Sequence, residues 1–485
     1  MSVAGFVYDE RMLKHRCPYD DSVAESPNRI KNIYDRLTAD ELLNGCIHIP
    51  TRMATDQEIE LCHPKELIES LQQLRTQTDH EEHCKSRDLL YLCSDSLEAA
   101  QLAAGGTIEA MKAVVNEKCA NAFAIVRPPG HHSHGNLPQG YCIFNNVAIA
   151  AKVAVDKLGL QRVLIVDFDF HPPNGTYYSV HNDSRIVLAS LHNYMHGAAW
   201  PHTEDMDYTA PGNAVHIPLN RVGFTGRDYL AAFHHIILPI AKEWNPQLIL
   251  VSAGFDSALG DMGAVSQAVE APTYGHIVSL LNEIAPGKVC AVLEGGYFPP
   301  SYTECAAMTM RGIRGQPLPA VRYQYKPLNP VMVETIWHCL VHLSVKWDCI
   351  KGHLEALQEA QRRASLPEFV PRTPSIFLGK EMRAHFDQVI ARKKCRTREW
   401  MPQRSAEETA AIVAAINQYV DQYEYKTEQV IEKYEERLDE LRWCQVVSSE
   451  AFIQSAQSTL MFYQRFKTYI NSTDGKLLIG DRENF

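Results

Sequence analysis

The sequence lacks any hydrophobic run that approaches the roughly 18 residues of a membrane-spanning helix. Its first residues also lack the charged and apolar regions of a secretory signal. The 13 cysteines are odd in number and have no Cys-x-x-Cys pairing, which argues against a disulfide framework or a zinc knuckle. An excess of positive charge is missing too: the net charge is −11, which disfavours direct binding to a nucleic-acid backbone. We therefore expect an intracellular protein with reduced thiols that binds neither membranes nor nucleic acid directly.

What is present is the composition of an ordinary globular protein, with 45% hydrophobic and 22% charged residues. A chain of 485 residues is longer than one compact core usually fills, so we expect two domains or one large domain with an appendage.

Short β-branched apolar runs alternate with helical patterns through the first two thirds of the chain. The expected buried strands are 122–126, 163–166, 186–191, 248–252 and 289–293, and the expected helices between them are 97–115, 147–157, 229–242 and 274–284. This alternation predicts an α/β fold in three layers, with a central parallel sheet between two layers of helices.

The last third of the chain has a different character. Residues 331–364 carry one long helical pattern, and residues 365–374 contain three prolines and are typical of a linker. A capping box at 405–408 opens an apolar stripe that continues to residue 441, and 451–470 could fold back on it as a helical hairpin. We interpret this stripe as a packed helix pair, with a coiled coil or a partner-docking arm as the alternative. The predicted organisation is a catalytic domain over 1–350 and a linker with a helical extension over 351–485.

Five polar clusters lie at or near the ends of the predicted strands, at 127–132, 140–146, 167–171, 252–256 and 294–297. Ligands of parallel sheets bind beyond the carboxyl ends of the strands, so this is where a site is expected.

The residue types in these clusters favour metal-assisted hydrolysis of an amide. Asp169 and His171 are two positions apart and point to one side of an extended strand, and with Asp256 they form a plausible zinc set with open positions. The tandem His131 and His132 supply a general base and a general acid, because imidazole titrates near neutral pH. Each cluster by itself has an ordinary structural explanation, such as a loop histidine, a helix cap or a bare turn. Their joint occurrence at the strand ends favours a catalytic site over these structural explanations.

These motifs resemble the zinc-dependent histone deacetylases of the class II branch, over a stretch from Tyr8 to about Trp347. The resemblance implies an arginase/deacetylase-like fold and one zinc ion per chain. The implied roles are zinc ligation by Asp169, His171 and Asp256, paired proton transfer by His131 and His132, and polarisation of the substrate carbonyl by Tyr297.

The resemblance also implies supporting residues. Asp167 would orient His131, and Asn174 would support the second histidine. A structural potassium ion is implied at Asp167, Asp169, His171, Ser190 and Leu191, largely through backbone oxygens. The slot for the acyl-lysine chain is implied at Gly140, Tyr141 and Trp200.

The details of the motifs indicate a subclass. Tyr297 stands where the weakly active class IIa branch has histidine, so the sequence is more similar to class IIb, whose members act on proteins or on acetylpolyamines. Polyamine-selective relatives carry an acidic gatekeeper where this chain has Gly263. We therefore expect deacetylation of lysine side chains in histones or other proteins.

One departure from the family pattern matters. The family continues His-His-Gly-Asn-Gly, whereas this chain has Pro172 and Pro173 directly after His171. Two prolines remove two backbone N–H donors beside a metal ligand. The alternative is therefore a catalytically impaired scaffold or acyl-lysine-binding module in a corepressor-type complex. A manganese enzyme of the arginase type is a third hypothesis and ranks last, because the sequence presents only one ligand set.

Partners and compartment follow from these hypotheses. The expected partner is an acetylated protein, a histone tail or a cytoplasmic protein, with a protein complex on the C-terminal helices as a second. The basic cluster 392–396 could serve as a nuclear import signal, although such clusters are more often solvated helix faces. Nucleus and cytoplasm both stay open, and a role in chromatin and transcription regulation is one of the expectations.

Overall fold

The structure is a computed structural model that describes residues 3–76, 80–84, 87–221, 223–261, 267–321, 328–364, 369–370, 377–380, 383–384, 407 and 410. Within these residues, none of the helices has the length and apolar character needed to cross a membrane.

A parallel sheet of eight strands forms the centre of the domain, in the order β2-β1-β3-β8-β7-β4-β5-β6. The strands are β1 (Gly5–Val7), β2 (Ile47–His48), β3 (Ala122–Ala124), β4 (Val163–Asp167), β5 (Ile186–Asn193), β6 (Ala214–Leu219), β7 (Leu248–Ala253) and β8 (Val289–Leu293). Asp167 is level with Ser190 of β5 and with Ser252 of β7. The carboxyl ends of the central strands therefore meet at one edge of the sheet.

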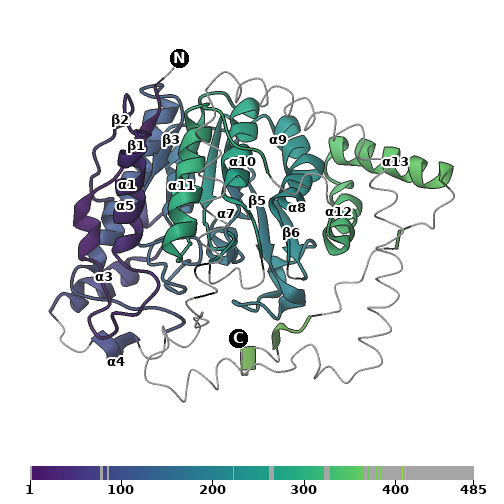
Figure 1. Cartoon of the computed structure of the whole chain (residues 1–485). Coiled ribbons are helices and arrows are strands. Elements are labelled where there is room, and N and C mark those ends of the chain that lie inside the picture. The colour runs from purple at the N-terminus through teal and green to yellow at the C-terminus, as the bar shows by residue number, and fades with distance from the viewer. Residues whose placement is uncertain are drawn as a thin grey trace.

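Helices cover both faces of this sheet (Figure 1). The helices are α1 (Asn28–Ala39), α2 (Asp56–Ile59), α3 (Lys65–Leu74), α4 (His80–Cys84), α5 (Ser96–Val115), α6 (Asn146–Asp156), α7 (Asn174–Val180), α8 (Gly226–Ala232), α9 (Leu238–Trp244), α10 (Ala271–Ile284), α11 (Pro299–Ile313), α12 (Pro330–Leu343) and α13 (Asp348–Arg363). Helices α5, α6 and α7 pack together on one face, and α1, α10, α11 and α12 lie on the other. The predicted three-layer α/β/α fold with a parallel sheet is confirmed.

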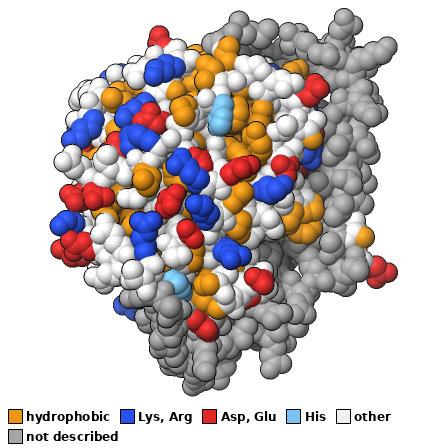
Figure 2. Space-filling view, turned by 90° about the vertical axis from the view of Figure 1, so that its left-hand side faces the viewer, with side chains coloured by type: hydrophobic (Ala, Val, Ile, Leu, Met, Phe, Trp, Pro, Cys, Tyr) orange, Lys and Arg blue, Asp and Glu red, His pale blue; other side chains and the backbone are white. Residues whose placement is uncertain are grey.

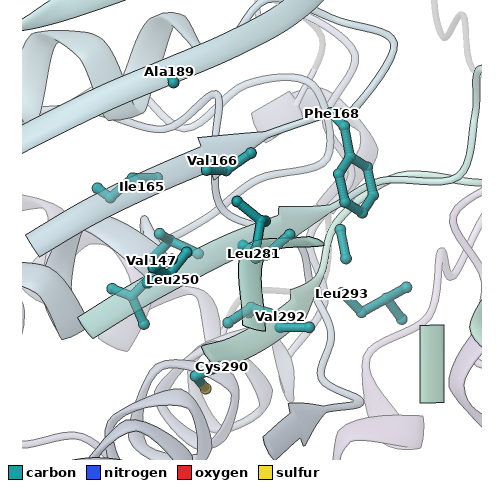
Figure 3. Packing of buried hydrophobic residues seen from close by; sticks show 14 of the residues in the cluster. Val147, Ile165, Val166, Phe168, Ala189, Leu250, Leu281, Cys290, Val292 and Leu293 are labelled. Carbon is teal, nitrogen blue, oxygen red and sulfur yellow. The ribbon is translucent and has the colours of Figure 1, made fainter. Parts of the chain in front are cut away.

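The apolar strand runs form the core between the layers. Ile165 and Val166 of β4 and Leu250 of β7 are fully buried, and they pack with Val147 of α6 and Leu281 of α10 (Figure 3). Each such side chain contributes about 1.5–3 kcal/mol when it leaves water. These runs are apolar throughout because both faces of a parallel sheet are covered.

All five predicted strands exist, but three further strands do not follow from the apolar pattern. Strand β1 has three residues and β2 has two, so neither gives a pattern long enough to detect. Strand β6 contains Pro218, which lacks an N–H group. The proline is tolerated because β6 lies at the edge of the sheet and pairs only with β5 among the described strands.

The prediction of one helix over residues 331–364 is wrong. Helix α12 ends at Leu343, and α13 begins after Trp347, whose backbone is extended at φ −120° and ψ 118°. Trp347 is buried against Trp244 at 6.2 Å between ring centroids, and the Glu243 carboxylate accepts the N–H of Cys349 at 2.8 Å. Contacts from α9 therefore start a new helix at a position where the local pattern is continuous.

The predicted C-terminal features lie outside the described residues. They are most of the linker 365–374, the basic cluster 392–396, the apolar stripe up to 441 and the segment 451–470. The division of the chain into 1–350 and 351–485 and the helical extension stay predictions.

The face shown in Figure 2 carries Lys and Arg side chains interspersed with Asp and Glu, with small hydrophobic areas between them. This mixture differs from the uniform basic surface that tracks a phosphate backbone.

Candidate active site

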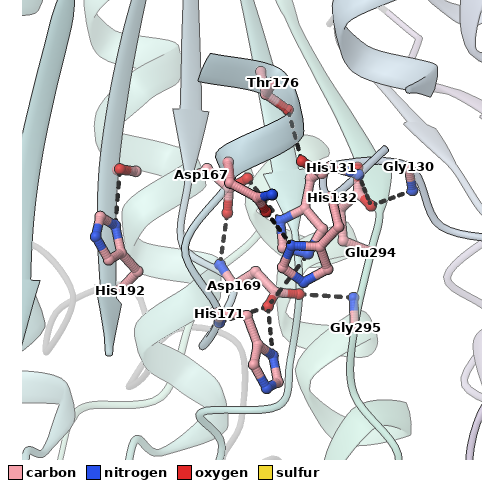
Figure 4. Close-up of polar contacts among 12 residues, drawn as sticks. Gly130, His131, His132, Asp167, Asp169, His171, Thr176, His192, Glu294 and Gly295 are labelled. Carbon is pink, nitrogen blue, oxygen red and sulfur yellow. Dashed lines mark hydrogen bonds and ion pairs between the residues drawn. The ribbon is translucent and has the colours of Figure 1, made fainter. Parts of the chain in front are cut away.

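Three metal-type ligands converge beyond the carboxyl ends of β4 and β7. Asp169 and His171 follow β4, and Asp256 follows β7. His171 Nδ1 lies 2.8 Å from Asp256 Oδ2 and 3.4 Å from Asp169 Oδ1. The three ligand atoms all lie within 4.8 Å of one another, so one ion could reach them all. Figure 4 shows Asp169 and His171 of this trio beside the tandem histidines.

Backbone groups hold the two carboxylates in place. Asp169 accepts the N–H of Gly295 at 2.8 Å and that of His171 at 2.9 Å, while Asp256 accepts the N–H of Phe170 at 2.7 Å. A Cβ atom on Gly254 would collide with the carboxylate of Asp169. Glycine at this position is therefore required for the close approach of β7 to the ligand.

The charge balance of this trio favours a cation. Asp169 and Asp256 are fully buried, and burial together with the charge of Asp169 raises the pKa of Asp256 to about 7. Burial opposes the charge of Asp169 as well, but the His131 and His171 imidazoles outweigh it and lower its pKa. Two carboxylates and an imidazole with open positions are the donor set of a catalytic zinc site, and a divalent cation would compensate their buried charge.

The tandem histidines lie beside these ligands with their rings 3.9 Å apart. His131 Nδ1 is 3.1 Å from Asp167 Oδ2, and its Nε2 is 3.7 Å from Asp169 Oδ1. His132 Nδ1 is 2.8 Å from Asn174 Oδ1. Each Nδ1 is therefore engaged by a supporting side chain, and Nε2 of each ring is left for the site.

The surroundings of the two histidines shift their pKa values in opposite directions. Burial lowers the pKa of His131, but the carboxylates of Asp169 and Asp167 outweigh it and raise the pKa to about 10. Burial and the neighbouring imidazoles keep the pKa of His132 well below 6.5, since its support is a neutral amide. Such a divergence is typical of an acid and base pair.

Tyr297 lies on the loop after β8, and its position is fixed by the backbone. Its N–H and that of Phe298 donate to Asp261 Oδ2 at 2.6 Å and 2.8 Å. The Arg29 guanidinium donates to the carbonyl of Gly296 at 2.7 Å and lies 4.9 Å from the centroid of the Tyr297 ring. Burial holds the pKa of the Tyr297 phenol well above 10, so the phenol keeps its proton.

Aromatic rings flank this cluster on two sides. The ring of Trp200 is 4.5 Å from that of His132 and 6.1 Å from that of His171, between centroids. The ring of Tyr141 is 5.9 Å from that of Tyr297. A Cβ on Gly140 would lie 2.6 Å from both His132 and Trp200, so only glycine fits there. The structure brings the three predicted slot residues to the cluster.

The residues of the predicted potassium site also lie together. Asp167 and Ser190 are paired in the register of β4 and β5, and Leu191 follows Ser190 in β5; Ser190 and Leu191 are fully buried. Asp167 Oδ1 accepts the N–H of Asp169 at 3.0 Å, and Ser190 Oγ lies 3.0 Å from His192 Nδ1. Because these side chains have partners, an ion there would depend on backbone oxygens, as the resemblance implies.

The double proline leaves the ligand geometry intact. Pro173 precedes α7, and Pro172 and Pro173 accept hydrogen bonds from Asn174 and Tyr177 at 2.8 Å and 2.9 Å. Both missing N–H groups lie at or before the N-cap of α7, where the helix needs no backbone donor. His171 faces Asp256 and Asp169, although its side chain is 30% exposed.

Comparison with known proteins decides the family. The Histone deacetylase domain matches residues 23–313 of this chain. The chain belongs to the histone deacetylase family. This family is zinc-dependent, and the ligand trio of this chain could hold a metal ion.

The relatives of this histone deacetylase domain are deacetylases by name, and they support its place in the class II branch. The chain is 37% identical over 330 residues to Polyamine deacetylase HDAC10 of Danio rerio, covering 66% of this chain and 49% of the relative. It is 32% identical over 378 residues to Histone deacetylase HDA1 of Saccharomyces cerevisiae, covering 72% and 53%. The crystal structure of the HDA15 HD domain matches with a TM-score of 0.66 and 28% identity, over 74% of this chain and 99% of that one. The chain thus spans about half the length of the curated relatives it matches.

A buried ion-pair network beneath the candidate active site was missed by sequence reasoning. The Glu25 carboxylate accepts hydrogen bonds from Arg127 Nε and Nη2 at 2.9 Å and 2.6 Å, from Arg29 at 3.1 Å and from the Tyr91 hydroxyl at 2.7 Å. Arg127 is part of a predicted polar cluster, but nothing in the local sequence marks Glu25.

A further group of buried donors lies behind the tandem histidines. His131, Cys142 and Glu294 offer ligand atoms within 4.8 Å of one another. Glu294 Oε2 already accepts the N–H of Gly130 at 2.7 Å and that of His131 at 3.1 Å. Burial raises the pKa of Glu294 to about 7. We interpret Glu294 as the residue that ties the histidine loop to β8.

Proposed function

We propose that this protein is a zinc-dependent hydrolase that removes acetyl groups from lysine side chains of histones or other proteins. The observation that carries the proposal is the convergence of Asp169, His171 and Asp256 within 4.8 Å. Beside them lie two imidazoles, one held by a carboxylate and the other by an amide. A zinc ion held by this trio would lower the pKa of a water molecule and polarise an amide carbonyl.

The protein's own residues would perform the remaining work. His131 and His132 would hold and move protons at Nε2, one as general base and the other as general acid for the departing amine, because each Nδ1 is engaged by Asp167 or Asn174. The neutral phenol of Tyr297 would donate a hydrogen bond to the carbonyl oxygen as negative charge develops on it. Tyr141 and Trp200 would enclose the methylene chain of the substrate lysine and exclude water.

We propose a protein substrate, although HDAC10 relatives are named polyamine deacetylases. An acidic side chain at the slot would be needed to attract a polyammonium chain. In the stretch after Asp256, Asp261 is fully buried and accepts two backbone N–H groups, so it does not serve that purpose. The gatekeeper position Gly263 lies outside the described residues and stays a prediction from the sequence.

The second candidate is a scaffold or acyl-lysine-binding module without turnover, acting in a corepressor-type complex. The observation in its favour is the Pro172–Pro173 pair next to His171, because small displacements of a catalytic group, of about an ångström, cost roughly a hundredfold in rate. We also propose a structural potassium ion beside the site, a protein complex on the C-terminal helices and a location in the nucleus or the cytoplasm.

The test is a metal and activity assay on the full chain. We expect about one zinc per chain, turnover of acetyl-lysine peptides and inhibition by a hydroxamate chelator. Asp256→Asn should lose both zinc and turnover, whereas His132→Ala should keep zinc and lose turnover; Asp35→Asn, an exposed surface change, is the control. Acetyl-histone, acetyl-tubulin and acetylpolyamine substrates compared side by side identify the substrate class.

The outcomes separate the two candidates. Metal-replete protein that is inert on all three substrates contradicts the hydrolase proposal, and peptide affinity without product supports the binding module. Replacing Pro172 by His and Pro173 by Gly should change turnover by less than about threefold if His171 is already well placed. A rise of roughly a hundredfold from a background level would instead support the impaired scaffold.

A further inference from the structure

A short part of the chain beyond α13 returns to the active-site end of the sheet. We call it the C-terminal strap, and it consists of the described residues 377–380 and 383–384. Green pieces of chain beyond α13 lie below the lower ends of β5 and β6 in Figure 1, at the edge where the site residues gather.

The first contact of the strap is with the loop after β5. The N–H of Leu378 donates to the carbonyl of His196 at 2.8 Å. The ring of Phe377 lies so close to Gly197, where φ is +83°, that no Cβ would fit there. A Cβ on Gly379 would in turn lie 2.9 Å from the carbonyl oxygen of His202. The backbone of the strap therefore lies directly on this loop.

This loop is the one that carries Trp200. Gly197 and His202 flank Trp200 in sequence, and His202 Nδ1 lies 3.2 Å from the carbonyl oxygen of Gly197. Trp200 is the ring packed against His132 and His171. The first contact is thus made by the loop that holds one proposed wall of the slot.

The second contact of the strap is with the segment behind the other proposed wall of the slot. Arg383 Nη1 lies 2.8 Å from Asp88 Oδ2, and the side chains are 40% and 8% exposed. The carbonyl of Asp88 accepts the N–H of Gly140 at 3.0 Å, and the carbonyl of Leu89 accepts that of Tyr141 at 2.7 Å. The second contact is thus made by the segment that braces the other proposed wall.

The two contacts are made by positions only five residues apart, 378 and 383, and residues 379–380 and 383–384 are helical. We infer that the surface formed by His196, Gly197, His202 and Asp88 is a docking surface for the C-terminal strap, and that the docked strap competes with a protein substrate for the slot. This inference rests on the proposed function. The surface suits a peptide that presents an aromatic ring, a glycine and, further on, an arginine, because it offers a glycine face, a backbone carbonyl and a nearly buried carboxylate.

Competition has a defined kinetic consequence. The slot accepts substrate only in the fraction of molecules whose strap is undocked, so the apparent KM is the intrinsic value divided by that fraction. Releasing the strap should lower KM for a peptide and leave kcat unchanged, since the described strap residues contact the loop that carries Trp200 and the Asp88 carboxylate, which lie outside the proposed catalytic residues.

The test compares Arg383→Ala and Phe377→Ala with wild type in the full chain. The matched control is Arg363→Ala, which removes a 78% exposed arginine paired with Glu359 on α13. We expect KM for an acetyl-lysine peptide to fall about threefold or more in the two strap variants, with kcat and the control unchanged. Hydrogen exchange should find the Leu378 amide protected in wild type and in the control, and unprotected in both strap variants.

The two readouts keep the inference separate from the proposed function. If all proteins lack turnover, the proposed function fails, and the Kd of the same peptide replaces KM as the measure of competition. An unprotected Leu378 amide in wild type overturns docking. If the amide is protected in wild type and unprotected in both strap variants, an unchanged KM or Kd in those variants overturns the competition.

Discussion

Replacing Glu25 by Gln is the sharpest test of how the site is held together. The Glu25 side chain is 0% exposed and lies between the Arg127 and Arg29 guanidinium groups, which are 0% and 2% exposed. Glutamine keeps the shape of the side chain and removes its charge. It also replaces one of the two acceptor oxygens by an NH₂ group, which is itself a donor and faces the donors of the arginines.

The expected cost follows from burial. Breaking a buried ion pair leaves an uncompensated buried charge and costs about 3–5 kcal/mol. Glu25 neutralises guanidinium groups that cannot reach water, so we expect a loss in that range in the free energy of unfolding. The melting temperature should fall by about 6–20 °C, at the 2–4 °C per kcal/mol typical of large domains.

Urea unfolding at pH 7.5, followed by circular dichroism, measures this loss against a matched surface pair. Lys31 and Asp35 are 53% and 54% exposed at 2.5 Å, and Asp35→Asn should cost less than about 1 kcal/mol. Calorimetry on the same proteins gives the melting temperatures.

A small loss of stability in Glu25→Gln would refute this reasoning. If Glu25→Gln costs no more than Asp35→Asn, the buried network does not carry the stabilisation assigned to it. The loop after β8 would then have to be fixed by its other contacts, such as those of Arg29 with the Gly296 and Glu294 carbonyls.

Three more predictions test the site and the core. Gly254→Ala should abolish zinc binding, measured by metal analysis, because its Cβ collides with the Asp169 carboxylate; a variant with full zinc content contradicts the packing argument. Asn174→Ala should reduce kcat by about 10–100-fold while zinc content is retained, because it removes the support of His132; unchanged kcat would rule out that role. The free energy of unfolding should fall as the pH drops below about 6.5, because burial lowers the pKa of five histidines to about 3 or 4 in the folded protein, and only the unfolded chain takes up their protons. Each should contribute about 1.4 kcal/mol per pH unit down to its folded pKa, and the five outweigh Asp256 and Glu294, whose raised pKa values of about 7 act in the opposite direction. Urea unfolding at pH 7.5, 6.5 and 5.5 would contradict this with a flat profile; the histidines are His15, His63, His192, His234 and His235.

The sequence by itself determined the layered parallel fold and the location of the site. Apolar runs such as Val289–Leu293 report burial on both faces, and the polar clusters that follow them must meet, because parallel strands end at one edge of the sheet. Asp169, His171 and Asp256 therefore come together as their positions after β4 and β7 require.

Only the tertiary structure decided the features that depend on distant segments. Trp244 and Glu243 of α9 end one helix and start another at Trp347, although the local pattern is continuous there. His131 and His132 are adjacent and identical in type, yet their pKa values move apart because one faces carboxylates and the other an amide. The buried position of Glu25 and the contact of Arg383 with Asp88 likewise join residues far apart in the chain. Local patterns encode which residues are buried, whereas charge, desolvation and pairing depend on distances that only the folded chain sets.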